Sequence, residues 1–281
     1  MVILNGSAYR LCGLDTCILS DLLEHDAAAA RGFVTLLPPS EVIPCFSPYT
    51  LFELRSRREI YEEFLSFFDV YPCIILKNED QLFKDELDAY PNPEDVEASL
   101  FPFSFLNKAK GMNLRALIER LFDDPSVIRR ELEWPILKED LLRDWLNNKD
   151  NFSPSGERYN NSDANRFVQE ATVQQLMGRA PRWSRDRIRI DGDVKTTGFP
   201  SLRMILYTLF FRLYASEDRV PQPQDVFDVL ISASTPYLDA VITENFQADI
   251  YSRLKKLDPP LSRFRIYTIR NLLEAATAQT T

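Results

Sequence analysis

Histidine is almost absent from this chain, and its scarcity excludes several kinds of active site. The sequence has 281 residues but a single histidine, His25. A mechanism that uses two histidines as acid and base therefore cannot operate within one chain, and a Ser-His-Asp or Cys-His arrangement would have to use His25. That residue stands in Glu-His-Asp-Ala-Ala, which is typical of a solvated helix start. We therefore expect no catalytic histidine.

Glycine and cysteine are also scarce, and neither shows the spacing of a known site. The eight glycines never form Gly-x-Gly-x-x-Gly, and no Gly-Lys-Ser or Gly-Lys-Thr occurs, so the usual phosphate-binding loops are excluded. Cys12, Cys17, Cys45 and Cys73 form neither Cys-x-x-Cys nor a Cys/His zinc pattern. Their apolar surroundings are typical of buried, reduced thiols, and the first residues lack a signal-peptide pattern. We expect a cytoplasmic protein.

Long apolar runs and an excess of positive charge are missing as well. Met204–Phe211 is the longest apolar stretch near the middle of the chain, and Arg203 and Arg212 bound it. A membrane-spanning helix needs about 20 apolar residues, so we expect no membrane partner. The formal net charge of −9 gives no general attraction to nucleic acid, so any such binding has to be local.

Short apolar segments that alternate with helical stretches are the main structural signal. Asp15 follows the first segment in a position typical of a helix N-cap, and Ser47-Pro48 opens the helix after the second. The alternation predicts an α/β fold with three layers, α/β/α, around a mainly parallel, twisted central sheet. The expected strands are Tyr9–Leu14, Val42–Phe46, Cys73–Lys77, Ala240–Thr243 and Arg265–Ile269. The expected helices of the second half are Leu202–Tyr214, Asp225–Tyr237 and Asn245–Lys256.

The middle of the chain interrupts this pattern. Residues 91–199 are polar and punctuated by prolines, and 187–194 has the pattern of a hairpin. We expect residues 1–90 and 200–281 to form the α/β core and 91–199 to form a mostly helical insertion. Its expected helices are Leu114–Phe122, Leu137–Leu146 and Asn165–Met177.

Three acidic residues stand where an α/β sheet binds ligands, beyond the carboxyl ends of its strands. Asp15 directly follows the first strand, Glu53 lies early in the helix after the second, and Asp228 lies in the first turns of the helix before the fourth. Clustered carboxylates repel one another unless a cation neutralises them. Carboxylates around Mg²⁺ or Mn²⁺ are sufficient to hydrolyse phosphodiesters, so the pattern predicts a divalent-metal site.

Each of these residues also has an ordinary structural interpretation. Asp15 would serve as a helix cap, and Glu53 as a solvated helix residue. Asp225 competes with Asp228 as N-cap or ligand, and the 11-residue step from Asp228 to Asp239 favours Asp228. The order, spacing and element type of the three acids together favour the site over these separate interpretations.

The three acids lie in three segments, which are Leu14–Leu19, Pro48–Leu54 and Asp228–Asn245. These segments resemble the PIN-domain nucleases, a family of Mg²⁺- or Mn²⁺-dependent endoribonucleases. The first is similar to the family's strand-end Asp followed by Thr or Ser, and the second to the helix that brings in its Glu. The third resembles the family's third acid, the helix behind it, the Asp before the last core strand and the closing Thr-x-Asp.

The resemblance covers roughly residues 8–90 and 200–270 and implies roles for particular side chains. The implied catalytic and primary metal-binding residues are Asp15, Glu53 and Asp228. Further metal contacts are implied for Glu244 and Asn245, and positions around the metal for Thr16, Thr243 and Asp239. Asn245 stands where the family has its fourth acid, and since asparagine carries no charge, occupancy of a second metal position is left open.

A basic segment departs from the acidic average. From Arg179 to Arg203, seven Arg or Lys residues stand against three Asp residues, which gives +4. The alternation predicts a strand with three guanidinium groups on one face beside a tryptophan, a surface suited to RNA phosphates and bases. The alternative is a solvated strand face. The residues concerned are Arg182, Trp183, Arg185, Arg187 and Arg189.

The sequence therefore predicts a Mg²⁺- or Mn²⁺-dependent endoribonuclease that acts on single-stranded or structured RNA, with a protein inhibitor or a second copy as candidate partners. One alternative is a PIN-like scaffold that binds RNA or protein without cleaving it. Another is a haloacid-dehalogenase type of phosphatase, but its pattern needs a second Asp where Cys17 stands.

Overall fold

The computed structural model describes residues 2–4, 7–24, 27–71, 73–90, 113–149, 151–179, 182, 185–186, 195–216, 219–261 and 263–278. The strands are β1 (Val2–Leu4), β2 (Ser7–Leu14), β3 (Val42–Phe46), β4 (Ile74–Ile75), β5 (Ala240–Ile242) and β6 (Arg265–Tyr267). The α-helices are α1 (Thr16–Glu24), α2 (Ala27–Leu36), α3 (Pro48–Arg55), α4 (Arg58–Val70), α5 (Glu79–Ala89), α6 (Leu114–Phe122), α7 (Pro125–Lys149), α8 (Asn161–Arg179), α10 (Pro200–Leu209), α11 (Asp225–Ile231), α12 (Asn245–Leu257) and α13 (Ile269–Ala278). Short 3-10 helices are η3 (Thr196–Gly198), η5 (Ser232–Tyr237) and η6 (Pro259–Leu261), and η4 (Phe210–Tyr214) is a π-helix.

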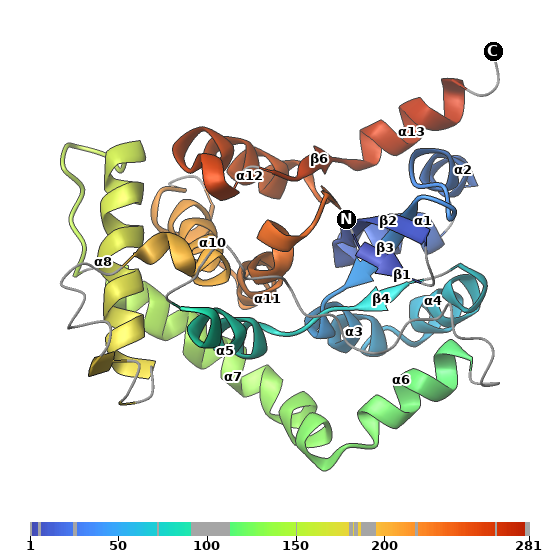
Figure 1. Ribbon diagram of the computed structural model, residues 1–281, viewed down its shortest axis with the longest axis horizontal. Helices are drawn as coiled ribbons and strands as arrows, with labels where there is room; N and C mark the ends of the chain where they lie inside the picture. Colours follow the sequence, from blue (N-terminus) through green and yellow to red (C-terminus); the bar gives the residue numbers. More distant parts are fainter. Residues whose placement is uncertain are drawn as a thin grey trace.

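The central sheet is parallel, as the sequence predicts. Its strands lie in the order β4-β3-β2-β5-β6, and β1 pairs with β2 in the antiparallel direction (Figure 1). The chain first moves outward from β2 through β3 to β4, and later returns to the other side of β2 for β5 and β6. The strand order therefore reverses between β2 and β5, and in open α/β sheets this is where ligands bind.

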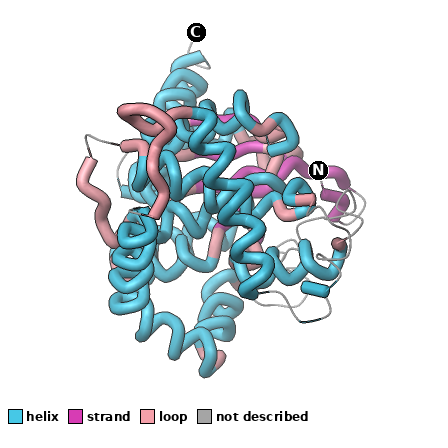
Figure 2. The backbone as a smooth tube through the Cα atoms, turned by 90° about the vertical axis from the view of Figure 1, so that its left-hand side faces the viewer, coloured by secondary structure: helices cyan, strands magenta, loops and turns pink. Residues whose placement is uncertain are grey.

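Helices cover both faces of the sheet, so the expected three layers are present. Along β3, Ile43 and Cys45 belong to one hydrophobic cluster, whereas Val42 and Phe46 belong to the other. This alternation is the period of a strand that is buried on both faces. Helices α1, α2, α4, α6 and α13 contribute to the cluster of Val42, and α5, α7, α8, α10, α11 and α12 to that of Ile43. Figure 2 shows the strands packed between helices, with the strands near the N-terminus at the edge of the molecule.

The insertion helices pack into both clusters, α6 into that of Val42 and α7 and α8 into that of Ile43. Helix α7 is longer than the sequence predicts, because it runs through Pro135. Beside that proline the Trp134 ring is buried against Tyr49 and Phe227, at centroid distances of 4.9 and 5.2 Å. This packing offsets the hydrogen bond that proline removes from a helix. The predicted hairpin at 187–194 lies outside the described residues. None of the described helices is both long and apolar enough to cross a membrane.

The helix expected at Leu202–Tyr214 changes its geometry partway. It is α-helical to Leu209 and continues as the π-helix η4. The backbone N–H of Ala215 donates to Phe210 O at 2.9 Å, which is the wider turn of a π-helix. Such turns are rare and often occur at functional sites. The residue at the middle of this turn is Arg212.

The four cysteines are free thiols. Cys12, Cys45 and Cys73 are buried, as expected, but Cys17 is exposed, so the expectation of a buried thiol was wrong there. The reason is the helical period of α1, which buries Ile18 and turns position 17 outward.

Candidate functional site

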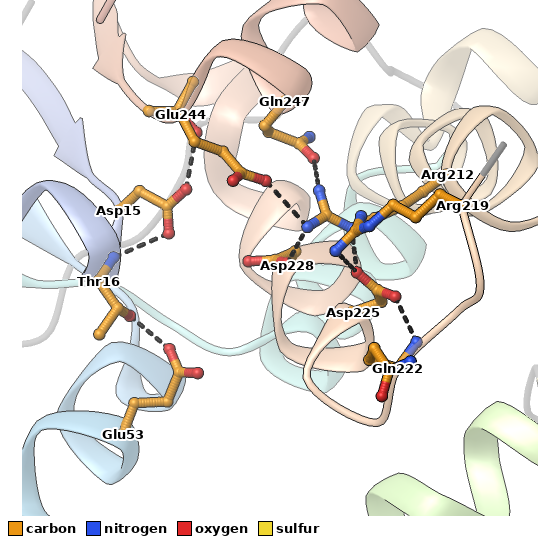
Figure 3. Close-up of polar contacts among 11 residues, drawn as sticks. Asp15, Thr16, Glu53, Arg212, Arg219, Gln222, Asp225, Asp228, Glu244 and Gln247 are labelled. Atoms are coloured by element: carbon orange, nitrogen blue, oxygen red, sulfur yellow. Dashed lines mark hydrogen bonds and ion pairs between the residues drawn. The ribbon is translucent and has the colours of Figure 1, made fainter. Parts of the chain in front are cut away.

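Asp15 lies at the carboxyl end of β2, beside the end of β5. Its backbone N–H donates to Ile242 O at 3.1 Å, and its carbonyl accepts from Leu19 as the N-cap of α1. Both carboxylate oxygens are also bound. Oδ1 accepts from the Thr16 N–H at 2.8 Å, and Oδ2 accepts from the Thr243 hydroxyl at 2.7 Å (Figure 3). The two threonines therefore fix the carboxylate at the point where the strand order reverses.

Glu53 is brought to the same edge by α3. Ser47 caps this helix by accepting from the Tyr49 N–H at 3.2 Å, with Pro48 in the first turn, as the sequence predicts. The hydroxyl of Thr16 donates to the Glu53 carboxylate. Burial raises the pKa of Glu53 to about 7, although this hydrogen bond lowers it in part. One threonine thus contacts two of the predicted acids, Asp15 through its N–H and Glu53 through its hydroxyl.

Asp228 approaches from the other side, on the first turn of α11. Burial raises its pKa well above the ordinary value, and the negative charge of Asp15 raises it further. The charge of Arg212 acts in the opposite direction. Burial is likewise the main reason why the pKa of Asp15 is raised, and the hydrogen bonds from Thr243 and Thr16 lower it in part. Asp15 and Asp228 are therefore close enough to disfavour each other's charge.

Arg212 is a central residue of this site, and the sequence analysis did not identify it. Its side chain is buried, with an exposed fraction of 2%. The guanidinium donates to Asp225 through Nε at 2.8 Å and to Gln247 Oε1 through Nη1 at 2.7 Å. Through Nη2 it also donates to Asp228, and to Glu244 at 3.0 Å. An arginine with partners from α11 and α12 therefore lies among the acids (Figure 3).

Asp225, which competed with Asp228 in the sequence, anchors this arginine. It is fully buried and accepts from the Gln222 N–H at 2.6 Å. Arg219 pairs with the same carboxylate at 2.7 Å. The guanidinium carbons of Arg212 and Arg219 lie 5.2 and 4.9 Å from the Phe246 ring centroid, within the range of cation–π attraction.

Glu244 and Asn245, for both of which the resemblance implies a metal contact, lie in different surroundings. Glu244 is the N-cap of α12, but its carboxylate makes no cap hydrogen bond and pairs with Arg212 instead. Asn245 is the first residue inside the helix and is exposed. The charged residue of this pair is therefore the one that reaches the acids.

Asp239 is not brought to this edge. It precedes β5, at the amino end of the strand, and its Oδ2 accepts from the Leu11 N–H at 2.8 Å. Because the site lies beyond the carboxyl ends of β2 and β5, the expected position of Asp239 around a metal was wrong. Its carboxylate joins neighbouring strands instead.

A small cavity of about 30 Å³ opens beside the acids. Asp15, Asp228, Thr243 and Gln247 are among its lining residues. Most of its lining is apolar, but a cavity of this size has room for a water molecule beside these polar side chains, and so for a small cation. In the part of the chain that the structure describes, Nε2 of Gln247 is buried without a hydrogen-bond partner. Since its Oε1 accepts from Arg212, this amide N–H is a donor still available to a bound molecule.

The acidic side chains do not converge on a single point. Within the described ranges, no three Asp, Glu, His or Cys side chains lie close enough together to hold a metal ion. The reason lies in their other partners, since Arg212 binds Asp228 and Glu244, and Thr16 binds Glu53. Two carboxylates, Asp15 and Asp228, share the cavity.

The basic segment is described only in part. Arg182 and Arg185 have helical backbone, so the expected strand was wrong at Arg185. Arg182 is exposed and Arg185 is half-buried. Trp183, Arg187 and Arg189 lie outside the described residues.

The chain matches no known protein-family model, and comparisons with curated proteins and with solved structures gave no match.

Proposed function

We propose that this protein is a divalent-metal-dependent nuclease with a PIN-like core, and that it cleaves RNA internally. The observation that carries this proposal is the pair Asp15 and Asp228. The two carboxylates come from different elements, line one cavity at the reversal of strand order, and both have raised pKa values. Half-buried acids with this arrangement are typical of functional sites that bind a cation.

The chemistry of the donors fits Mg²⁺ or Mn²⁺. Both ions prefer oxygen ligands, and Mg²⁺ is commonly held through one or two carboxylates together with water and substrate phosphate. Asp15 and Asp228 would hold the ion in the cavity that they share. A bound divalent ion supplies Lewis-acid chemistry at a phosphodiester and neutralises its charge.

The residues around this pair have roles of their own. Thr16 and Thr243 fix the orientation of the Asp15 carboxylate, since each occupies one of its oxygens. Glu53, with a pKa of about 7, is able to take a proton from an attacking water at neutral pH. The amide of Gln247 is available to donate a hydrogen bond to a phosphate oxygen.

Positive charge is present beside these acids despite the acidic composition of the chain. Arg57 and Lys138 lie close enough to Glu53 for their charges to lower its pKa. Lys138 belongs to α7, and its ammonium group lies 5.5 Å from the Phe227 ring centroid. The insertion therefore places a cation beside the acids, where it would contact the backbone phosphates of RNA.

The test is cleavage of a fluorogenic single-stranded RNA in the presence of Mn²⁺. We expect Asp15→Asn and Asp228→Asn each to reduce the rate at least about 100-fold. Asp239→Asn is the matched control, because it changes the same kind of side chain at the other end of β5 and keeps an oxygen for the Leu11 N–H. Full activity in Asp15→Asn would reject the assignment.

A non-cleaving scaffold that binds RNA or protein is the second candidate. It is favoured by Arg212, which already neutralises Asp228 and Glu244. RNA binding in a gel-shift assay, with neither Mn²⁺ binding nor cleavage, would select this function over the nuclease.

A further inference from the structure

We infer that the guanidinium of Arg212 takes the place of a second divalent cation, so that the site binds a single ion on the side of Asp15. This inference rests on the proposed metal-dependent function, and it specifies how many ions the site accepts. It starts from the contacts of Arg212, which bridge carboxylates of α11 and α12 as a metal ion would.

The oxygens that a second ion would need are already bound. Nη2 of Arg212 contacts Oδ2 of Asp228 and, at 3.0 Å, Oε1 of Glu244. Charge-assisted hydrogen bonds of this kind are among the stronger ones in proteins. A metal ion between these two carboxylates would have to displace the guanidinium from both.

Displacing the guanidinium is unfavourable because other groups hold it. Nε is bound to Asp225 at 2.8 Å, and Nη1 to Gln247 at 2.7 Å. Asp225 is fully buried, so moving Arg212 away would leave it with Arg219 as its one remaining cationic partner among the described residues. The π-helical turn closed by Phe210 and Ala215 sets the position of the arginine in the backbone.

The charges at this edge also favour one ion. When ionised, the carboxylates carry five negative charges and the two guanidinium groups carry two positive ones. The difference is three negative charges, and Arg57 and Lys138 beside Glu53 offset part of it, so after one divalent ion no net negative charge remains to favour a second. The residues counted are Asp15, Glu53, Asp225, Asp228 and Glu244, with Arg212 and Arg219.

The space for that one ion lies on the side of Asp15. The cavity of about 30 Å³ is lined by Asp15, Asp228 and Gln247, and Nε2 of Gln247 is buried without a hydrogen-bond partner among the described residues. This amide is an observation independent of the acids, and it points to a bound water or ligand oxygen next to the ion. Glu244 does not line the cavity.

The test is the number of Mn²⁺ ions bound per chain, measured by equilibrium dialysis with metal analysis on the full-length protein. We expect one ion in the wild type and a second ion in Arg212→Gln, because the substitution frees the oxygens of Asp228 and Glu244. Absence of any gain in folded Arg212→Gln would overturn the inference.

Glu244→Gln provides a second variant that does not depend on removing a buried arginine. The Glu244 side chain is 40% exposed, so the fold tolerates its neutralisation. If Arg212 engages Glu244 in place of a metal, this variant binds one Mn²⁺ with an affinity within about threefold of the wild type, whereas Asp15→Asn weakens binding at least about tenfold. Equal weakening in both variants would make Glu244 a metal ligand and overturn the inference.

The outcomes separate the inference from the proposed function. Two ions in the wild type would leave a metal-dependent nuclease standing and overturn the role of Arg212. No ion in the wild type and one in Arg212→Gln would reject both a metal-dependent nuclease and the single ion on the side of Asp15, and would leave only the exclusion of a cation by Arg212 standing. No ion in either protein would reject both.

Discussion

The site at the carboxyl ends of β2 and β5 has two halves, which hold their carboxylates in different ways. On one half, Asp15 and Glu53 accept hydrogen bonds from neutral groups of Thr16 and Thr243. On the other half, Asp225, Asp228 and Glu244 share the guanidinium of Arg212. We call these the threonine half (Asp15, Glu53) and the arginine half (Asp225, Asp228, Glu244).

This difference indicates on which half the proposed cation would bind. Neutral donors orient a buried carboxylate but do not neutralise its charge, and burial raises the pKa of both Asp15 and Glu53. The arginine half contains its own positive charge. The proposed divalent ion would therefore be most favourable on the threonine half, and Asp228 lies between the two because it lines the cavity and also pairs with Arg212.

The largest expected effect is that of Arg212→Gln on stability. Removing the arginine leaves Asp225 and Asp228 without their main cation, and breaking a buried ion pair from one side costs about 3–5 kcal/mol. Arg219→Gln is the control, since Arg219 pairs with the same Asp225 but is 37% exposed, and it should cost about 1 kcal/mol or less. Both free energies of unfolding are to be measured by urea denaturation. Equal losses would mean that Arg212 does not hold this half together.

The substitution Glu86→Gln tests how a buried carboxyl group that has only neutral hydrogen-bond donors, away from the site, affects the pH dependence of stability. Glu86 is fully buried on α5, and its Oε1 accepts from the Ser201 N–H at 2.6 Å and the Tyr237 hydroxyl at 2.5 Å. Burial raises its pKa from 4.5 to about 7. The folded protein therefore binds a proton that the unfolded chain releases between these pH values, and the free energy of unfolding falls as pH rises through this window.

Glutamine keeps the accepting oxygen and does not titrate. We expect Glu86→Gln to equal the wild type near pH 4.5 and to exceed it by about 2–3 kcal/mol near pH 8. The measurement is urea denaturation at both pH values. An identical pH dependence in the two proteins would show that neutral donors hold the Glu86 carboxylate as well in its charged form as in its protonated form.

Asp15→Asn and Asp228→Asn should change stability in opposite directions when metal is removed with EDTA. The first substitution keeps an amide that can bond to both threonines and removes an unneutralised charge, so stability should stay the same or rise by up to about 1 kcal/mol. The second also relieves a charge that burial disfavours, but it removes a charged contact of the buried Arg212 guanidinium, and we expect this loss to be larger, so stability should fall by about 1–2 kcal/mol. Thermal unfolding compares the two variants directly. A change of the same sign in both would remove the distinction between the halves.

The parallel sheet was predictable because its signals are local. Short buried segments separated by helices leave few arrangements, and the sequence predicts all the strands from β2 to β6. The Ser47-Pro48 start of α3 and the cap at Asp15 are likewise set by neighbouring residues. The positions of Asp15, Glu53 and Asp228 near one edge follow from these elements. The PIN-like identity of the core stays a prediction.

The arginine half was not predictable in the same way, because its contacts are distant in the sequence. Arg212 reaches Asp225, 13 residues away, and Glu244, 32 residues away. In the sequence it appears only as the residue that ends an apolar run. A usable signal was present, since a charged residue in Phe-Phe-Arg-Leu-Tyr has to find a buried partner.

The spacing of residues in the sequence also did not predict where individual side chains of the site lie. Asp239 matches the expected order but lies at the amino end of β5, because the residues between Asp228 and the strand form α11 and η5. Glu244 and Asn245 differ by one position, and the start of α12 decides which of them reaches Arg212.

The smallest expected effect is that of Asn245→Asp, and it bears directly on the second ion. The sequence leaves the second metal position open because Asn245 replaces an acid. In the structure Asn245 is exposed in the first turn of α12, while Arg212 holds the neighbouring Glu244. A carboxylate at a helix N-terminus is stabilising by about 0.3–1 kcal/mol.

We therefore expect Asn245→Asp to raise the free energy of unfolding by about 0.5 kcal/mol and to leave one Mn²⁺ per chain, because a new charge does not free the oxygens that Arg212 occupies. Urea denaturation and equilibrium dialysis give the two quantities on the same protein. A second ion in Asn245→Asp would show that the missing acid, and not the arginine, limits the site to one ion. If Asn245→Asp binds one ion, the combined variant Arg212→Gln/Asn245→Asp gives the converse test, because a second ion that appears only when the arginine is absent assigns the limit to Arg212.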